Sequence, residues 1–275
     1  MGPMKGLLVF ILILGVIYLL LVAPRMRKRA KRAPFLQQVF YAHRGLFDNE
    51  GDAPENSLAA FQKAVEAGYG MEMDVQLTKD DKLVVFHDAS LERMCGIEGN
   101  VWEYTLEELQ QMKLAKSDET IPSFEDVLKL VNGRAPLIVE YKMDRPLTKA
   151  CAIGNELLKD YPGVYCIESF HPFALMWYRK HCPEVMRGQL SGNLAKETTD
   201  WKKKISYTLV SYLLTNLLTR PDFIAYDYRY VGNVSRWMCK WLGAMSVAYT
   251  IKSVERYEKV KEAFDLFIFD SCKLG

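Results

Sequence analysis

The sequence predicts an α/β fold, a TIM-type (β/α)8 barrel with a small insertion, preceded by one N-terminal transmembrane helix. Short apolar runs alternate with helix-like segments along most of the chain, which is typical of parallel strands joined by helices. The length of 275 residues suits one such barrel. A continuous apolar stretch near the N-terminus stands apart from this alternation.

Eight apolar runs are expected to be the parallel strands. They are rich in Val, Ile, Leu, Phe and Tyr, and most are bounded by turn-forming or polar residues. These runs are residues 39–43, 71–77, 136–141, 165–169, 185–190, 223–226, 244–249 and 266–269. A doubly wound parallel sheet is the structural alternative.

The segments between these runs are expected to form the outer helices. Their ranges are residues 57–67, 123–130, 147–159, 172–181, 235–242 and 254–263. Residues 82–86 predict an extra strand after a turn. Residues 89–119 then predict the small insertion, with a helix of its own near 106–112.

The N-terminal apolar run covers residues 7–22 and extends to 6–23, close to the lower limit of about 17 residues for a membrane-spanning helix. A cluster of basic residues follows it: Arg25, Arg27, Lys28, Arg29, Lys31 and Arg32. Under the positive-inside rule the cluster stays in the cytoplasm. The sequence therefore predicts a single-pass protein of the cell membrane with an anchor at 1–24, a basic juxtamembrane linker at 25–37 and a cytoplasmic catalytic barrel at 38–275. A cleaved signal peptide is the alternative.

Charge and cysteine usage narrow the classes of partner. The net charge is +2, and outside the basic cluster the balance is mildly acidic, which argues against nucleic acid as a partner. The six cysteines are scattered without a CxxC pair, so reduced thiols are expected, in agreement with a cytoplasmic barrel. The oligomeric state is left open.

Residues 205–218 form a further apolar segment, interrupted by Ser, Thr and Asn. The segment is too short to span a membrane, so a buried helix is expected. An interfacial helix near the mouth of the active site is the alternative.

Acidic residues inside the predicted strands indicate a metal site. Glu72 and Asp74 are two residues apart, so on a strand they point to the same face. Glu140 ends another apolar run, with Lys142 two residues further on. Because functional groups of such barrels gather at the strand ends, these three carboxylates could converge on one hard divalent cation. Buried ion pairs, such as Glu140 with Lys142, are the alternative.

Two histidines stand at the ends of predicted strands. His43 ends the first run and is followed by Arg44 and Gly45, while His87 and Asp88 follow the extra strand. Such positions suit a general acid and a general base at the barrel mouth. Gly45 predicts a positive φ or a close backbone approach. The other two histidines are expected to be structural.

These residues lie in motifs that resemble the glycerophosphodiester phosphodiesterase family. The motifs HRG (43–45), PENS (54–57), EMDVQLTKDDKLVVFHD (72–88) and EYK (140–142) have the order and spacing of its signature. The similarity continues more weakly through residues 121–128, 169–172, 248–250 and 265–270, and so covers nearly all of the chain after residue 40.

The resemblance implies metal-dependent hydrolysis of glycerophosphodiesters to glycerol 3-phosphate and an alcohol. The implied ligands of the cation, Ca²⁺ or Mg²⁺, are Glu72, Asp74 and Glu140. The implied acid–base and substrate-binding residues are His43, His87, Arg44, Lys142 and Glu55, the last lying near the metal or orienting its neighbours. The sequence departs from the family pattern at Ser57, Tyr249 and Phe269. These departures do not affect the metal site, but they put in doubt whether the family's leaving-group pocket applies to this chain.

Two further functions remain as alternatives. One is a lysophospholipase D acting on membrane lysophospholipids, which membrane proximity favours. The other is a membrane-bound sensor that binds glycerophosphodiesters without turnover. The pair of histidines argues against the sensor, because a binding protein does not need an acid–base pair.

Overall fold

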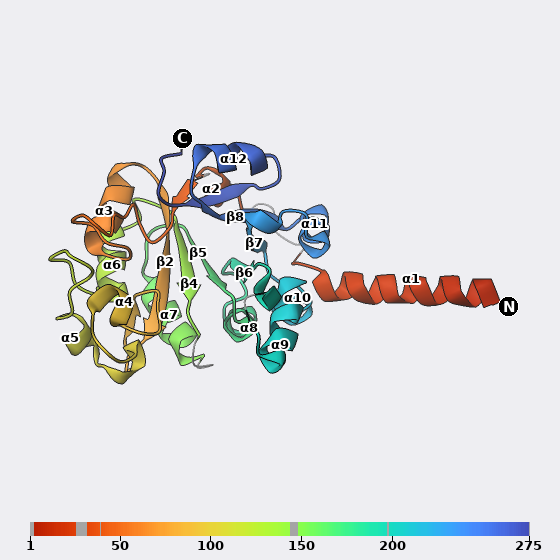
Figure 1. Ribbon diagram of the computed structural model, residues 1–275, viewed down its shortest axis with the longest axis horizontal. Coiled ribbons are helices and arrows are strands. Elements are labelled where there is room, and N and C mark those ends of the chain that lie inside the picture. Colours follow the sequence, from red (N-terminus) through yellow and green to blue (C-terminus); the bar gives the residue numbers. More distant parts are fainter. Residues whose placement is uncertain (1–2, 26–31, 39, 144–147, 197, 275) are drawn as a thin grey trace.

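The computed structural model describes residues 3–25, 32–38, 40–143, 148–196 and 198–274. Within these residues eight parallel strands form the barrel wall (Figure 1). They are β1 (Phe40–Ala42), β2 (Gly70–Leu77), β4 (Leu137–Tyr141), β5 (Tyr165–Ser169), β6 (Arg187–Ser191), β7 (Phe223–Asp227), β8 (Met245–Ile251) and β9 (Leu266–Phe269). The order is β1-β9-β8-β7-β6-β5-β4-β2, and pairing of β1 with β2 closes the ring. The predicted TIM-type barrel is confirmed, although residue 39 lies outside the described part.

The outer helices cover this wall near their predicted positions. They are α3 (Leu58–Glu66), α6 (Phe124–Val131), α7 (Lys149–Lys159), α8 (Pro172–His181), α11 (Val234–Trp241) and α12 (Val254–Val260). Short polar side chains set several starts: Ser57, Ser123 and Ser253 each accept a hydrogen bond from a backbone N–H of the first turn. The predicted start of α7 at residue 147 lies outside the described residues.

The extra strand and the insertion are also confirmed. Strand β3 (Leu83–Val85) pairs antiparallel with β2, so it stands beside the parallel ring. The insertion carries α4 (Glu92–Cys95) and α5 (Leu106–Leu109) around a small core of its own, which includes Val84 and Leu91.

The single buried helix expected over residues 205–218 is wrong. The structure has two helices there, α9 (Trp201–Ser211) and α10 (Asn216–Thr219). Leu213 between them has φ +56°, which ends one helix and redirects the chain before the next. Ile205 and Leu209 are exposed, because the apolar stripe of α9 faces away from the barrel.

Helix α1 (Pro3–Val22) projects from the barrel beside α10 and α11 (Figure 1). By length and composition its residues Met4–Val22 could cross a membrane or serve as a signal sequence. Most of the basic cluster, residues 26–31, lies outside the described part of the chain. The segment expected as a linker ends in a short helix, α2 (Ala33–Leu36), whose Phe35 closes the floor of the barrel against residues such as Tyr41 and Phe223.

Candidate active site

Three carboxylates meet inside the barrel. Glu72 and Asp74 lie two residues apart on β2, and Glu140 on β4 pairs in register with Asp74. One oxygen from each carboxylate lies within 4.8 Å of the other two, and all three side chains are buried. The alternation of side chains along a strand therefore brings the predicted ligands together.

The electrostatics of this carboxylate cluster suit a cation. Burial and then the charge of Asp74 hold the pKa of Glu72 well above its usual range. Burial likewise raises the pKa of Glu140, against the pull of Lys142. Among the described residues Glu72 Oε1 has no hydrogen-bond partner. A buried set of oxygen donors with unmet capacity fits a hard divalent cation such as Ca²⁺ or Mg²⁺.

Two basic side chains border the carboxylates. Lys142 Nζ lies 2.7 Å from Glu140 Oε1 and 3.0 Å from Asp74 Oδ1. Arg44 Nε lies 3.3 Å from Asp74 Oδ2, and its Nη1 donates to Glu55 Oε1 over 2.7 Å. The ion pair of Glu140 with Lys142, expected as an alternative to a metal site, is thus present beside a carboxylate cluster that still fits a metal.

His43 stands at the end of β1 with both ring nitrogens facing carboxylates. Its Nδ1 lies 3.1 Å from Asp270 Oδ2, and its Nε2 lies 4.0 Å from Glu72 Oε2. Burial lowers the pKa of His43, although the hydrogen bond with Asp270 opposes this. The Asp270 contact suits a tautomer with the proton on Nδ1, which leaves Nε2 free to accept a proton.

His87 follows β3 and is held in a similar way. Its Nδ1 lies 2.6 Å from Asp88 Oδ1. Arg93 on α4 contacts Asp88 and donates to Glu55 Oε1 over 2.6 Å. Glu55, which was expected near the metal or as an orienting group, therefore joins Arg93 to Arg44. Burial opposes ionisation of Glu55, but the hydrogen bond from Arg93 lowers its pKa to about 2.

Both histidines, both basic side chains and two of the three carboxylates line one cavity of about 190 Å³ at the carboxyl ends of the strands. Its polar lining is His43, Arg44, Glu72, His87, Glu140, Lys142, Glu168 and Thr250, and its apolar side includes Phe170, Leu190, Tyr249 and Ile268. Two imidazoles, two cations and the carboxylates of Glu72, Glu140 and Glu168 thus face one small space. Charge neutralisation and proton transfer on a bound anion are the chemistry that this lining can perform.

Residues 43–216 match the model of the family described as the glycerophosphoryl diester phosphodiesterase family. The chain belongs to this family. It is 33% identical over 178 residues to a glycerophosphodiester phosphodiesterase of Bacillus altitudinis, covering 60% of this chain and 71% of the relative. A lysophospholipase D of Rattus norvegicus is 31% identical over 157 residues, covering 52% of this chain and 48% of that relative. The fold matches a phosphodiesterase of Oleispira antarctica in complex with the product sn-glycerol-3-phosphate, with a TM-score of 0.69 and 26% identity over 86% of this chain and 94% of the other.

In this phosphodiesterase the HRG motif forms a strained loop under the site. Arg44 has φ +56° and its backbone N–H donates to Glu72 Oε2 over 3.2 Å. Gly45 has φ +81°, and a Cβ there would lie 2.8 Å from the carbonyl carbon of Ala60. The expected positive φ and close approach at Gly45 are confirmed, and both explain why glycine occupies this position.

Three polar residues of the site were not predicted. Asn56 of the PENS motif is buried and donates to Asp74 Oδ2 over 2.8 Å. Asp270 holds His43 from the end of β9. Glu168 on β5 pairs in register with Glu140, is buried, and has no hydrogen-bond partner for Oε2 among the described residues. Burial and the charge of Glu140 raise the pKa of Glu168. An acidic residue in an apolar strand was the signal available for Glu168, the same signal that identified Glu140.

Proposed function

We propose that the chain hydrolyses glycerophosphodiesters to glycerol 3-phosphate and an alcohol, with His43 and His87 as the acid–base pair. The observation that carries this proposal is the pair of carboxylate-bound imidazoles facing the carboxylate cluster across one cavity. The glycerol 3-phosphate bound to the Oleispira antarctica structure supports the substrate class.

Glu72, Asp74 and Glu140 would hold a divalent cation. When bound, the cation supplies Lewis-acid neutralisation of phosphate charge. Arg44 and Lys142 add positive charge from the wall of the cavity, which supports assigning both to the nonbridging phosphate oxygens. Glu55 keeps the Arg44 guanidinium in place.

We assign His43 as the base, since its lowered pKa favours the neutral ring and Asp270 occupies Nδ1. Nε2 of His43 takes the proton of the nucleophile, which is water or the neighbouring glycerol hydroxyl, as the new P–O bond forms. The bond from phosphorus to the leaving oxygen then breaks, and His87 supplies the proton to that oxygen. Attack by water gives glycerol 3-phosphate directly. Attack by the hydroxyl gives a cyclic glycerol phosphate, which water then opens to glycerol 3-phosphate by breaking one of its P–O bonds.

A second candidate function is lysophospholipase D activity. The rat relative of that name and the projecting apolar helix α1 favour it. Turnover of glycerophosphocholine, glycerophosphoglycerol and a lysophospholipid by the full chain in detergent tests both functions. The proposal expects the water-soluble diesters to be hydrolysed with release of glycerol 3-phosphate. Hydrolysis of the lysophospholipid alone would replace it with the second candidate.

We further propose that α1 anchors the protein as a single-pass helix with the barrel in the cytoplasm. Contacts at the end of the helix support retention over cleavage of a signal sequence. The hydroxyl of Tyr18 lies 2.6 Å from Ser235 Oγ, and Asn216 Nδ2 donates to the carbonyl of Val22 over 2.9 Å. The six cysteines are all free, which agrees with a reducing compartment.

A further inference from the structure

Helices α9 and α11 carry apolar stripes that face away from the barrel. On α9 the stripe is Trp201, Ile205, Leu209 and Tyr212 at the helix end, and on α11 it is Val234, Trp237 and Trp241. The spacing within each stripe places its side chains on one side of the helix. A surface helix ordinarily turns such a stripe toward the core, yet Trp201, Trp237 and Trp241 are 67%, 60% and 69% exposed.

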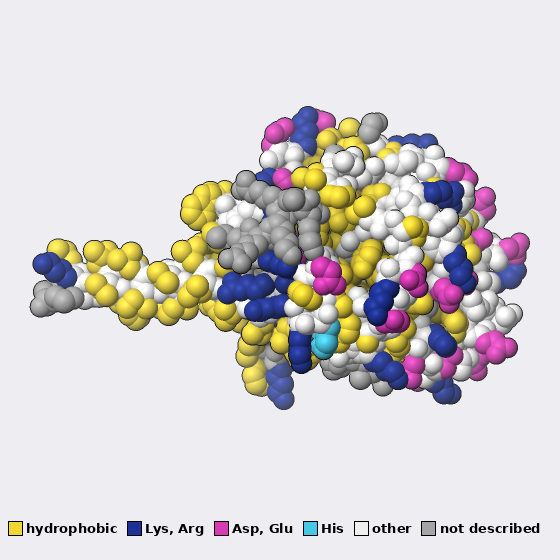
Figure 2. All heavy atoms as spheres, turned by 180° about the vertical axis from the view of Figure 1, so that it is seen from behind, with side chains coloured by type: hydrophobic (Ala, Val, Ile, Leu, Met, Phe, Trp, Pro, Cys, Tyr) yellow, Lys and Arg dark blue, Asp and Glu magenta, His cyan; other side chains and the backbone are white. Residues whose placement is uncertain are grey.

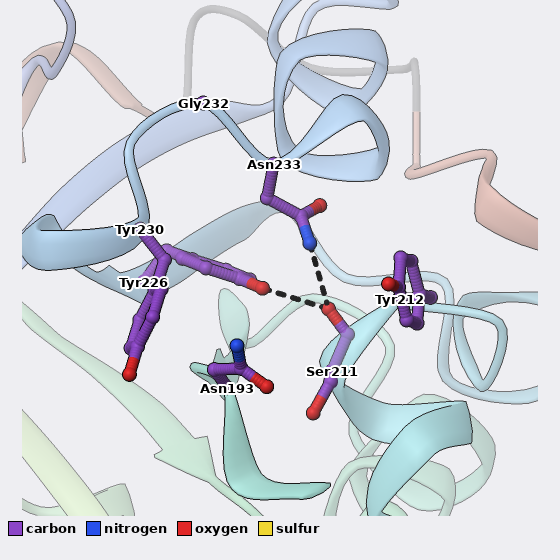
Figure 3. A pocket seen from close by; sticks show the side chains of 7 residues that line it. All are labelled: Asn193, Ser211, Tyr212, Tyr226, Tyr230, Gly232 and Asn233. Atoms are coloured by element: carbon purple, nitrogen blue, oxygen red, sulfur yellow. Dashed lines mark hydrogen bonds between the residues drawn. The ribbon is translucent and has the colours of Figure 1, made fainter. Parts of the chain in front are cut away.

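The end of α9 adjoins the start of α11, and we call the exposed apolar side chains of both helices, together with Leu217 and Leu218 of α10, the apolar wall. Ser211 ends α9, and its carbonyl accepts hydrogen bonds from the Tyr226 hydroxyl over 2.8 Å and from Asn233 Nδ2 over 3.4 Å (Figure 3). Asn233 in turn caps the start of α11. These bonds tie both helices to β7 around an uncharged cavity of about 290 Å³.

Helix α1 leaves the barrel beside the parts of this wall on α10 and α11. It packs against α10 and α11, and Arg220 Nη1 donates to the carbonyl of Ala23 over 2.8 Å. Hydrophobic side chains cover α1 and continue onto the part of the barrel at its base, where Lys and Arg side chains also gather (Figure 2). In a bilayer that α1 crosses, the hydrocarbon core would therefore begin beside the apolar wall.

We infer that the apolar wall lies in the headgroup region of the bilayer that α1 enters, so that the barrel rests on the membrane by its side. Tryptophan and tyrosine are both enriched at that depth. Exposed Lys202, Lys203 and Lys204 follow Trp201 directly and would contact anionic headgroups. The inference rests on the proposed anchoring by α1.

This placement also sets how a lipid would reach the site. The segment after β6 starts at the carboxyl end of the barrel, the end that holds the catalytic cavity. Trp201 begins α9 after that segment. In the chain, the start of α9 is therefore the part of the wall that follows the catalytic end of the barrel, and we place the approach of an inner-leaflet lysolipid there.

Quenching of tryptophan fluorescence by brominated lipid tests the inference on the full chain in nanodiscs of phosphatidylcholine and phosphatidylglycerol. Helix α1 contains no tryptophan, so the signal reports on the barrel. With three of the five tryptophans on the wall, brominated acyl chains should quench roughly half of the emission. A variant with Trp201→Phe, Trp237→Phe and Trp241→Phe should lose this quenching, while Trp102→Phe in the insertion should keep it.

The outcomes separate the inference from the anchoring on which it rests. Failure of the chain to enter nanodiscs would contradict both the proposed anchoring by α1 and the inferred position of the apolar wall. Entry without quenching, or quenching that survives the triple substitution, would contradict the inferred position of the apolar wall but not the proposed anchoring by α1. Two copies per nanodisc with unquenched tryptophans would assign the wall to a second copy of the chain, also against the inference.

Discussion

At the scale of single residues, the two histidines differ in surroundings and so should differ in role. His43 is the more enclosed and is bound to Asp270, whereas the side chain of His87 is 31% exposed beside Asp88. His43→Ala and His87→Ala should each lower kcat roughly 10²–10⁴-fold. A nitrophenyl diester, whose leaving group needs no proton, should restore much of the rate of His87→Ala and little of that of His43→Ala. Equal defects on both substrates would contradict the assigned roles.

The pH profile offers an independent check of His43. A base acts in its neutral form, which is present above its pKa, so kcat/KM should rise as pH increases through that pKa. Because burial lowers the pKa of His43, this acid limb of the profile should lie below about pH 6.5, the ordinary pKa of histidine.

The variant Asp270→Asn tests the role of Asp270. It removes a charge that raises the pKa of His43, so the acid limb should move to still lower pH. The plateau value of kcat/KM should fall roughly 10²-fold or more, because the variant no longer favours the tautomer of His43 with the proton on Nδ1. An unchanged plateau would show that Asp270 does not position the ring.

At the scale of elements, the loop from β1 to α3 depends on Gly45. Gly45→Ala would impose both the positive φ and the contact with Ala60, so the free energy of unfolding should fall by about 1–3 kcal/mol and kcat should fall as His43 and Arg44 move. Gly68→Ala is the matched control, because Gly68 has φ +75° with open space around its Cβ position. Denaturant unfolding and kcat of both variants in detergent measure the difference. Equal losses would mean that backbone strain alone, and not the contact, governs the loop.

The elements also show what the sequence could predict. Strands were identifiable because a fully buried strand such as β4 is a continuous apolar run. Burial of an acidic side chain in such a run costs free energy, and this is why Glu140 was a candidate for a functional residue. Helix α9 was misplaced because periodicity identifies an apolar stripe but not the side of the helix that the fold covers. Asn56 and Asp270 were missed since their partners, Asp74 and His43, lie far along the chain and only the closed barrel brings them together.

At the scale of the whole molecule, the proposed topology predicts the response to protease. With the barrel in the cytoplasm, protease added to intact cells should leave it whole and should cut it only after lysis. The positive residues after α1 are the physical reason, since they resist transfer across the membrane. Cleavage of the barrel in intact cells would place it on the outer side.

The proposed function requires that the carboxylate cluster bind the cation on which diester hydrolysis depends. The most direct measurement combines cation-dependent thermal unfolding with glycerophosphocholine turnover for the full chain and for Glu72→Gln, with Asp52→Asn at an exposed surface pair as the control. A ligand that binds the folded state raises the unfolding temperature, so Ca²⁺ or Mg²⁺ should do so for the parent and for Asp52→Asn. Glu72→Gln should fold at least as well without cation, because it relieves repulsion, yet should lose both the cation-induced rise and turnover. Full turnover by the parent in chelator, or a cation-induced rise and normal turnover in Glu72→Gln, would contradict the claim.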